Sequence, residues 1–408
     1  MDNKTNRIIN LYNNKSDCCG CGACMNICPK QAISMQPDEY GFIYPKIDEG
    51  ICISCGLCKK VCGYQTEVTA PEINDTYVAV AKDSEILRNS ASGGVFAALA
   101  TEVLNRGGVV FGCSMEQGNG KLIPQHIMVN DLKDIIKLQG SKYVQSYLGN
   151  TYMQAKSELD YGRLVLFSGT PCQIDGFKHY LMKDYGNLIT LDLICHGLPS
   201  AQMFQDYISE LEKKLKGQII DYKFRDKSKG WGLNAKTVYL KANTKLSKLY
   251  PCRASSYYSL FLESLIYREN CYSCKYANSN RVGDLTIGDF WGIENEHPQY
   301  LKSIDIRKGV SCVIVNNHHG ANMLRDLCKN IELFPSKFDN AARVNNQLNH
   351  PSNRSEKREE VLDIYKDKGY AAVSKWYKNS QGVKYYKDLV KGLLPDTLKS
   401  TLKRLLNK

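Results

Sequence analysis

Eight cysteines near the N-terminus have a spacing that suits iron chemistry. They form two runs with the pattern Cys-x-x-Cys-x-x-Cys-x-x-x-Cys, and these are Cys18, Cys21, Cys24 and Cys28, then Cys52, Cys55, Cys58 and Cys62. In proteins with two 4Fe-4S clusters, three thiolates of such a run bind one cube and the fourth binds the other. The pattern therefore predicts one cluster held by Cys18, Cys21, Cys24 and Cys62, and a second held by Cys52, Cys55, Cys58 and Cys28.

Zinc is the main alternative for these thiols, because Cys-x-x-Cys pairs also build zinc ribbons. Zinc ribbons lack the four-cysteine repeat and the Cys28-Pro29 pair that closes the first run. A disulfide scaffold is disfavoured further, since 17 cysteines in a chain of this length suit a reducing compartment. Cys19 lies outside the pattern and is interpreted as a spare thiol. Gly63 stands where a proline is usual after the second run.

Four later cysteines are candidates for a third cluster. Cys172 and Cys195 each follow a continuous apolar run that predicts a buried parallel strand. Because such strands end at the same edge of a sheet, the two thiols should lie close together. Cys271 and Cys274 form a two-cysteine clip that would complete a set of four, with Cys252 as a reserve ligand. Spacing alone leaves open that Cys172 and Cys195 are buried thiols and that the clip binds nothing.

A polar loop at 90–94, with the sequence Ser-Ala-Ser-Gly-Gly, precedes a helix predicted over 95–104. The first N–H groups of a helix are unpaired and lie at the positive end of its dipole, so this loop can hold a phosphate. The same residues also suit an ordinary helix cap. Lys142, in a second polar loop, could meet a pyrophosphate or a flavin carbonyl, or it could be a solvated surface charge.

The elements that must position these residues are expected in several units, because 408 residues exceed one domain of about 150 residues. We expect an α+β or α/β protein with a bacterial-type ferredoxin domain at 1–66, a mixed α/β body in two parts at 72–160 and 161–335, and a helical basic tail at 336–408. Strands are predicted at 77–81, 109–113, 164–167, 188–194, 286–291 and 310–315, and a further helix at 320–327.

The net charge is +12, from 54 basic and 42 acidic residues. A basic surface attracts acidic proteins, phosphate-bearing cofactors, anionic lipids or nucleic acids, and no nucleic-acid motif favours the last. The sequence has no apolar stretch long enough for a membrane span and no signal peptide, so we expect a cytoplasmic protein. Oxygen-sensitive clusters further suggest an anaerobe.

The basic tail carries apolar residues at helical spacing. They are Val383, Tyr386, Leu389, Val390, Leu393 and Leu394, followed by Leu398, Leu402, Leu405 and Leu406. Such an amphipathic helix either packs on its own body, which we favour, or contacts a membrane surface or a partner.

Over residues 15–320 the chain resembles the coenzyme F420 hydrogenase/dehydrogenase beta subunits, in the bacterial form with an N-terminal two-cluster ferredoxin domain. The resemblance rests on several motifs in order, which are Ser90-Ala91-Ser92-Gly93-Gly94, Gly140-Ser141-Lys142-Tyr143, Gly169-Thr170-Pro171-Cys172-Gln173, Cys195-His196-Gly197, Cys271-x-x-Cys274 and the stretch from Gly283 to Gly292.

This resemblance implies an FAD in the α/β body, a third 4Fe-4S cluster beside it, and hydride exchange with a deazaflavin or another organic acceptor. By motif, the third cluster would be held by Cys172, Cys195, Cys271 and Cys274. The FAD would lie at Ser92, Gly93 and Gly94, with Lys142 and Thr170 near it. His196 and Asp289 are candidate catalytic residues, and an equal alternative for His196 is a hydrogen bond that orients the neighbouring cluster loop.

Two functions are compatible with these parts. The first is an iron-sulfur flavoprotein oxidoreductase that passes electrons between ferredoxin, or another redox protein, and an organic acceptor. The second is an electron-transfer subunit of a larger complex without its own substrate. In both, clusters that carry single electrons would exchange them with a flavin that handles two.

Overall fold

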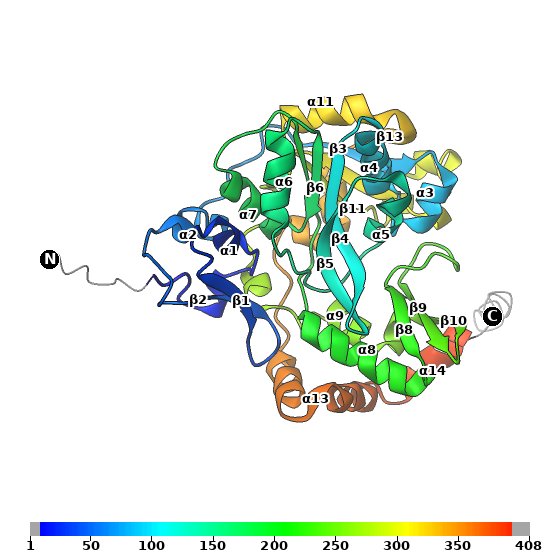
Figure 1. Ribbon diagram of the computed structural model, residues 1–408. Coiled ribbons are helices and arrows are strands. Elements are labelled where there is room, and N and C mark those ends of the chain that lie inside the picture. Colours follow the sequence, from blue (N-terminus) through cyan, green and yellow to red (C-terminus); the bar gives the residue numbers. More distant parts are fainter. Residues whose placement is uncertain (1–8, 394–408) are drawn as a thin grey trace.

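The computed structural model describes residues 9–393, and Figure 1 shows their arrangement. The N-terminal module consists of the hairpin β1 (Ile33–Pro37) and β2 (Ile43–Ile47) and the short helices α1 (Ala23–Ile27) and α2 (Leu57–Lys60). Each cysteine run leads into one of these helices through a glycine in the left-handed region, Gly22 with φ 75° and Gly56 with φ 76°. Glycine adopts this backbone without the clash of a Cβ, so both runs can turn tightly.

A mixed sheet of eight strands forms the centre of the body, in the order β13-β3-β12-β11-β7-β6-β4-β5. The strands are β3 (Asp75–Ala81), β4 (Val109–Gly118), β5 (Lys121–Val129), β6 (Val165–Gly169), β7 (Leu188–Leu193), β11 (Leu285–Asp289), β12 (Ser311–Val315) and β13 (Ile331–Ser336). Neighbours from β4 through β6 and β7 to β11 are parallel, and the pairs outside this run are antiparallel.

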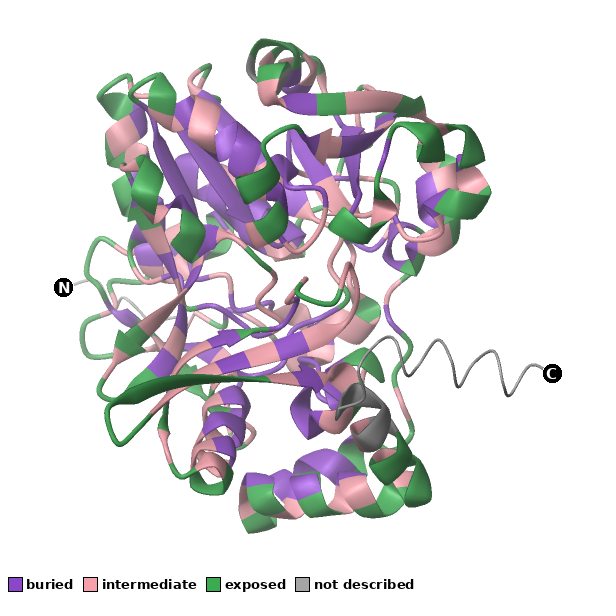
Figure 2. Cartoon of the chain, turned by 90° about the vertical axis from the view of Figure 1, so that its right-hand side faces the viewer, coloured by how far each residue is buried: buried purple, intermediate pink, exposed green. Residues whose placement is uncertain are grey.

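Helices cover both faces of this sheet (Figure 1). α4 (Val95–Asn105) and α11 (His318–Leu327) pack on one face, whereas α6 (Thr151–Asp160), α7 (Pro171–Leu181) and α12 (Phe338–Val344) pack on the other. Shorter helices are α3 (Ser84–Asn89), α5 (Ile135–Leu138) and α10 (Ile293–Glu296). Figure 2 shows the buried strands between helices whose outer faces are exposed.

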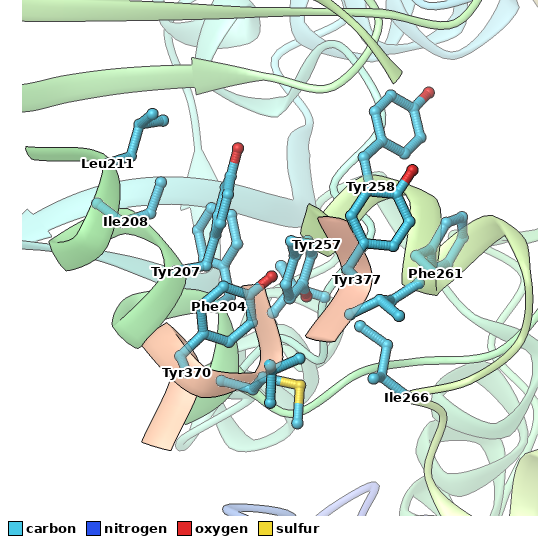
Figure 3. Close-up of a cluster of buried hydrophobic side chains, with 14 of the residues drawn as sticks. Phe204, Tyr207, Ile208, Leu211, Tyr257, Tyr258, Phe261, Ile266, Tyr370 and Tyr377 are labelled. Carbon is cyan, nitrogen blue, oxygen red and sulfur yellow. The ribbon is translucent and has the colours of Figure 1, made fainter. Parts of the chain in front are cut away.

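A second core lies between a three-stranded antiparallel sheet and four helices. The sheet has the order β10-β9-β8, with β8 (Gln218–Lys223), β9 (Asn234–Lys241) and β10 (Thr244–Pro251). The helices are α8 (Ala201–Leu215), α9 (Ser256–Leu262), α13 (Arg358–Gln381) and α14 (Val383–Leu393). Tyrosine rings dominate the contact between the sheet and the helices (Figure 3). For example, Tyr207 stacks on Tyr257 with their ring centroids 5.4 Å apart.

The C-terminal helices are therefore part of the fold. Tyr370 and Tyr377 of α13 are buried in the tyrosine-rich core. On α14, Val383 and Tyr386 remain 70% and 62% exposed. Leu394 and the later leucines of the predicted amphipathic segment lie outside the described residues. Contact of this tail with a membrane stays a prediction, and no helix within residues 9–393 is long and apolar enough to cross a bilayer.

The predicted fold class is confirmed, and each predicted strand and helix corresponds to an observed one. Strand β13 of the main sheet, the long hairpin of β4 and β5, and the small β8–β10 sheet were not predicted. Of the small sheet, β9 is largely half-buried, β10 is mostly exposed, and both carry lysines, so neither continuous burial nor clean alternation identifies them.

The N-terminal module docks closely on helix α7. A Cβ on Gly176 of α7 would lie 2.7 Å from the Cys21 Sγ, and a Cβ on Gly63 would overlap Asp175 Oδ2 and lie 2.6 Å from His179 Nδ1. Asn26 Nδ2 also donates to Gly149 O at 2.8 Å. The interface explains the missing proline after the second cysteine run, because position 63 has no room for any side chain.

We expect Gly63→Ala to destabilise the protein. The added methyl group must displace Asp175 or His179, and overpacking of this kind costs about 1–3 kcal/mol. The free energy of unfolding, measured anaerobically in urea, should fall by that amount. Gly186→Ala is the matched control, because a Cβ at Gly186 meets nothing within 4 Å and should leave the stability unchanged. Equal stability of the two variants would contradict the docking geometry.

Candidate functional site

The first set of cysteines, called the inner set, consists of Cys18, Cys21, Cys24 and Cys62. All four line one small cavity at the face of the module that meets the body. Burial raises the pKa of the Cys24 thiol, and the adjacent Cys18 and Cys62 raise it further. The crossover partner Cys62 thus lies with the first run, in the grouping that the spacing predicts.

The outer set consists of Cys28, Cys52, Cys55 and Cys58, which line a second small cavity. Cys55 is exposed, and Ile51 and Ile53 beside it are 49% and 56% exposed. Cys58 is also close enough to Cys24 to raise the pKa of that thiol. The outer set therefore adjoins the inner set on one side and solvent on the other.

The third set brings together Cys172, Cys195, Cys271 and Cys274 from three separate segments. Burial raises the pKa of the Cys271 thiol, and the nearby Cys195, Cys274 and Cys172 raise it further. The Cys19 thiol lies within hydrogen-bonding reach of both Cys21 and Cys172, between the inner and third sets.

Among residues 9–393, no three His, Cys, Asp or Glu side chains are arranged to hold a single metal ion. A 4Fe-4S cube spreads its four thiolate ligands over four different irons. Cys252, the reserve ligand, lies instead against the tyrosine-rich core.

A large cavity opens at the edge of the sheet where the parallel strands β6, β7 and β11 end. The cavity has a volume of about 250 Å³ and opens to solvent. Six of the predicted cofactor and catalytic residues line it, and these are Ser92, Gly94, Lys142, Thr170, His196 and Asp289. Cys195 of the third set lines the same cavity.

Gly93 is the predicted cofactor residue that does not line the cavity. Its N–H donates to Ser311 Oγ at 2.8 Å, and a Cβ there would be 2.6 Å from the Ser311 backbone nitrogen. Ser92 Oγ donates to Val310 O at 2.6 Å. The loop is thus fixed against β12, and the first N–H groups of α4, at Val95 and Phe96, have no partner among the described residues.

Lys142 lines the cavity and binds the carbonyl end of helix α5. Its ammonium donates to the carbonyl oxygens of Lys137, Leu138 and Gln139 at 3.1, 2.9 and 2.9 Å. Burial lowers the pKa of Lys142 to about 8, while the neighbouring Cys113 opposes this shift. Lys142 is therefore not a solvated surface charge.

His196 and Asp289 have different surroundings. No described residue forms a hydrogen bond with the ring nitrogens of His196, which is exposed and lines the cavity. Desolvation by the surrounding protein lowers the pKa of this histidine. Asp289 forms a bidentate ion pair with Arg225 at 2.7 and 3.2 Å and accepts from Trp231 Nε1 at 3.1 Å. His196 is thus available to a ligand, whereas Asp289 is already neutralised.

Thr170 joins the cavity to the third set. It caps helix α7 with Gln173 in a reciprocal capping box, and its Oγ1 lies 3.3 Å from Cys172 Sγ. Gln173 Nε2 also donates to Ser146 Oγ at 3.0 Å. The helix that carries Cys172 is therefore fixed by polar groups of the cavity itself.

Sequence reasoning missed several residues of this cavity. His126 is buried, with Nδ1 2.9 Å from Ser146 Oγ and Nε2 3.0 Å from Ser168 O, and burial lowers its pKa to about 4. Arg225 and Lys227, from the loop after β8, do not line the cavity but support residues that do. Arg225 pairs with Asp289, and Lys227 Nζ donates to Ser92 O and Leu87 O. No spacing pattern predicts these residues, because each of them acts through contacts with segments that are distant in the sequence.

Three domain families match the sequence. Residues 162–339 match the C terminus of the coenzyme F420 hydrogenase/dehydrogenase beta subunit, residues 76–151 match the N-terminal part of the same protein, and residues 17–66 match the 4Fe-4S dicluster domain. Among solved structures, the chain is similar to one in the F420-reducing NiFe hydrogenase complex from Methanosarcina barkeri, with 17% identity, a TM-score of 0.43 and coverage of 73% of this chain and 95% of that chain. No curated protein sequence matches.

The dicluster domain and the α/β body define an iron-sulfur protein of the oxidoreductase type. The two beta-subunit matches together span more than half of the chain. The chain belongs to the coenzyme F420 hydrogenase/dehydrogenase beta subunit family.

The neutral state of His126 predicts a dependence of stability on pH. The folded protein keeps this ring unprotonated down to about pH 4, whereas the unfolded chain binds the proton below about pH 6.5. The neutral His126 ring contributes its full stabilisation above pH 6.5. As the pH falls from there toward 4, the free energy of unfolding decreases by up to about 1.4 kcal/mol per pH unit.

Urea unfolding at pH 6.5 and 5.5 tests this expectation. The wild type should lose about 1 kcal/mol more than His126→Gln over this interval, because the unfolded histidine is already half protonated at pH 6.5. His350→Gln is the control, because His350 is exposed and should retain the wild-type slope. Parallel profiles for the wild type and His126→Gln would show that His126 is not the responsible group.

Proposed function

We propose that this protein is an iron-sulfur flavoprotein oxidoreductase that passes electrons between a redox protein and an organic acceptor. The observation that carries the proposal is the order of the cysteine sets. The outer set reaches solvent, the inner set adjoins it, and Cys19 lies between the inner set and the third set. Cys195 of the third set lines the large cavity. The three sets therefore lead from the surface to a cavity suited to a cofactor.

The proposed ligands of the two N-terminal 4Fe-4S clusters are the inner and outer sets, and those of a third cluster are Cys172, Cys195, Cys271 and Cys274. The dicluster domain match supports clusters in the module. For the third set, the support is the convergence of four largely buried thiols from distant segments. Buried thiolates require a compensating positive charge, which an iron cluster supplies.

FAD is the proposed occupant of the large cavity. The residues that line the cavity suit FAD in three respects. The free N–H groups at the start of α4 suit a pyrophosphate. A Cβ on Gly140, which lines the cavity, would meet nothing within 4 Å, so that wall is open to a ligand. Asp289 is the one carboxylate among the described lining residues, and Arg225 neutralises it, so an anion meets no repulsion.

A bound flavin would collect single electrons in pairs, take up a proton, and return them to an organic acceptor as a hydride. The chain's own residues would bind and position it. Lys142 and Thr170 hold the cavity wall, with Thr170 next to Cys172 of the third set, and His196 offers unoccupied ring nitrogens for a hydrogen bond or a proton transfer.

Iron, sulfide and flavin analysis of anaerobically purified protein tests this proposal. We expect about twelve irons and one FAD per chain, because each cube holds four irons. Cys172→Ser should lower the iron content to about eight, whereas the control Cys312→Ser, at a buried cysteine outside the three sets, should keep about twelve. About eight irons in the wild type, unchanged in Cys172→Ser, would remove the third cluster from the proposal.

The second candidate function is an electron-transfer subunit that docks a partner at the outer set. It is favoured by Ile51 and Ile53, which expose apolar surface beside Cys55.

An enzyme with its own acceptor should oxidise reduced ferredoxin without any other protein when candidate acceptors are added. His196→Gln should slow this reaction about 10²-fold if His196 transfers a proton, at unchanged flavin content. A chain that oxidises ferredoxin only with a copurified protein present would support the second candidate.

A further inference from the structure

Arg268 is a cation buried where the N-terminal module meets the body. It is 1% exposed. Its Nε donates to Cys18 O at 3.1 Å, Nη1 donates to Ile43 O at 2.8 Å, and Nη2 lies 4.0 Å from Cys18 Sγ. The guanidinium also lies over the ring of Tyr44, 3.9 Å from its centroid. All of these contacts join the body to the part of the module that carries the inner set.

The other buried arginines all have a carboxylate partner. Arg225 pairs with Asp289 at 2.7 Å, Arg281 with Asp192 at 2.8 Å and Arg358 with Glu269 at 3.1 Å. Arg268 forms no ion pair with a carboxylate among residues 9–393, and its remaining contact is with the amide oxygen of Gln145 at 3.4 Å. Of the four buried arginines, it alone has a charge that no described acidic side chain balances.

An unbalanced buried charge is costly, so a compensating anion is expected within contact distance. The thiolate of Cys18 is the candidate anion at this position, and four thiolates around a 4Fe-4S cube leave the whole group with a net negative charge. Hydrogen bonds to the sulfurs, nearby charge and exclusion of solvent all affect the potential of such a cluster. The guanidinium of Arg268 supplies the first two of these at the inner set, and its own burial shows that water is excluded on that side.

We propose that Arg268 is the counter-ion of the inner cluster and raises its reduction potential above that of the outer cluster. This inference rests on the proposed assignment of clusters to the two N-terminal sets. Among the described residues, the cations beside the outer set are Lys30, Lys59 and Lys60, which are all exposed, so that solvent screens their charges. One electron then leaves the outer cluster, which is oxidised, and enters the inner cluster, which is reduced, without a proton or a bond change. Arg268 thus biases electron flow inward, toward the third set.

A potentiometric titration of the full chain, followed by electron paramagnetic resonance, tests this role. In Arg268→Met, the reduced-to-oxidised ratio of one N-terminal couple at a fixed potential should fall at least tenfold, which corresponds to 59 mV for a one-electron couple. Arg268→Lys should recover most of this loss because it keeps the charge. Lys59→Met, which removes an exposed cation next to the outer set, should change no couple more than twofold.

The outcomes separate this inference from the proposed function. Full iron content in Arg268→Met together with unshifted couples would overturn the role of Arg268 alone, whereas a wild-type chain without iron at the N-terminal cysteines would overturn the proposed function. If Arg268→Met does not assemble its clusters, the order of the couples decides. The couple altered by Cys18→Ser must then lie above the couple altered by Cys52→Ser, and the reverse order would contradict the inference.

Discussion

The close contact between the N-terminal module and helix α7 is the constraint on which the other parts of the site depend. The inner set belongs to one folded unit and the third set to another, so their proximity depends entirely on how these units dock. Two glycines, Gly63 and Gly176, remove the side chains that would hold the units apart. Lys275 then donates to Gly63 O and Thr66 O across the contact. A looser interface would separate Cys19 from Cys172 and interrupt the series of cysteine sets.

The parallel part of the sheet provides the second requirement, because it ends several chemically different segments at one edge. β6 leads into Thr170 and Cys172, β7 leads into Cys195 and His196, and β11 ends at Asp289. Each strand thus contributes to the cavity, and two of them also contribute to the third cysteine set. This arrangement explains why the third set and the cavity share a wall. It follows from strand direction and requires no additional element.

The parts of the site that are local in sequence, or that follow from strand direction, could be predicted. The grouping of Cys62 with the first run follows from spacing, and the approach of Cys172 to Cys195 follows from parallel strands. Arg268 and His126 could not be found this way, because their roles depend on contacts with residues more than a hundred positions away or with backbone oxygens. The reason for Gly63 was equally hidden, since a missing side chain leaves no pattern in the sequence.

Charge in the large cavity is arranged to favour ligands that carry or gain negative charge. Burial lowers the pKa of Lys142, at the cavity wall, to about 8 and that of Lys227, behind the wall, to about 7. Nearby carboxylates, Asp221 and Glu116 for Lys142 and Asp289 for Lys227, offset this desolvation only in part. The Asp289 carboxylate is occupied by Arg225, and His126 is neutral above about pH 4. A phosphate or a reduced ring system entering the cavity would supply the missing negative charge. It would thereby raise the pKa of Lys142 again, so that binding of the anion and protonation of this lysine support each other.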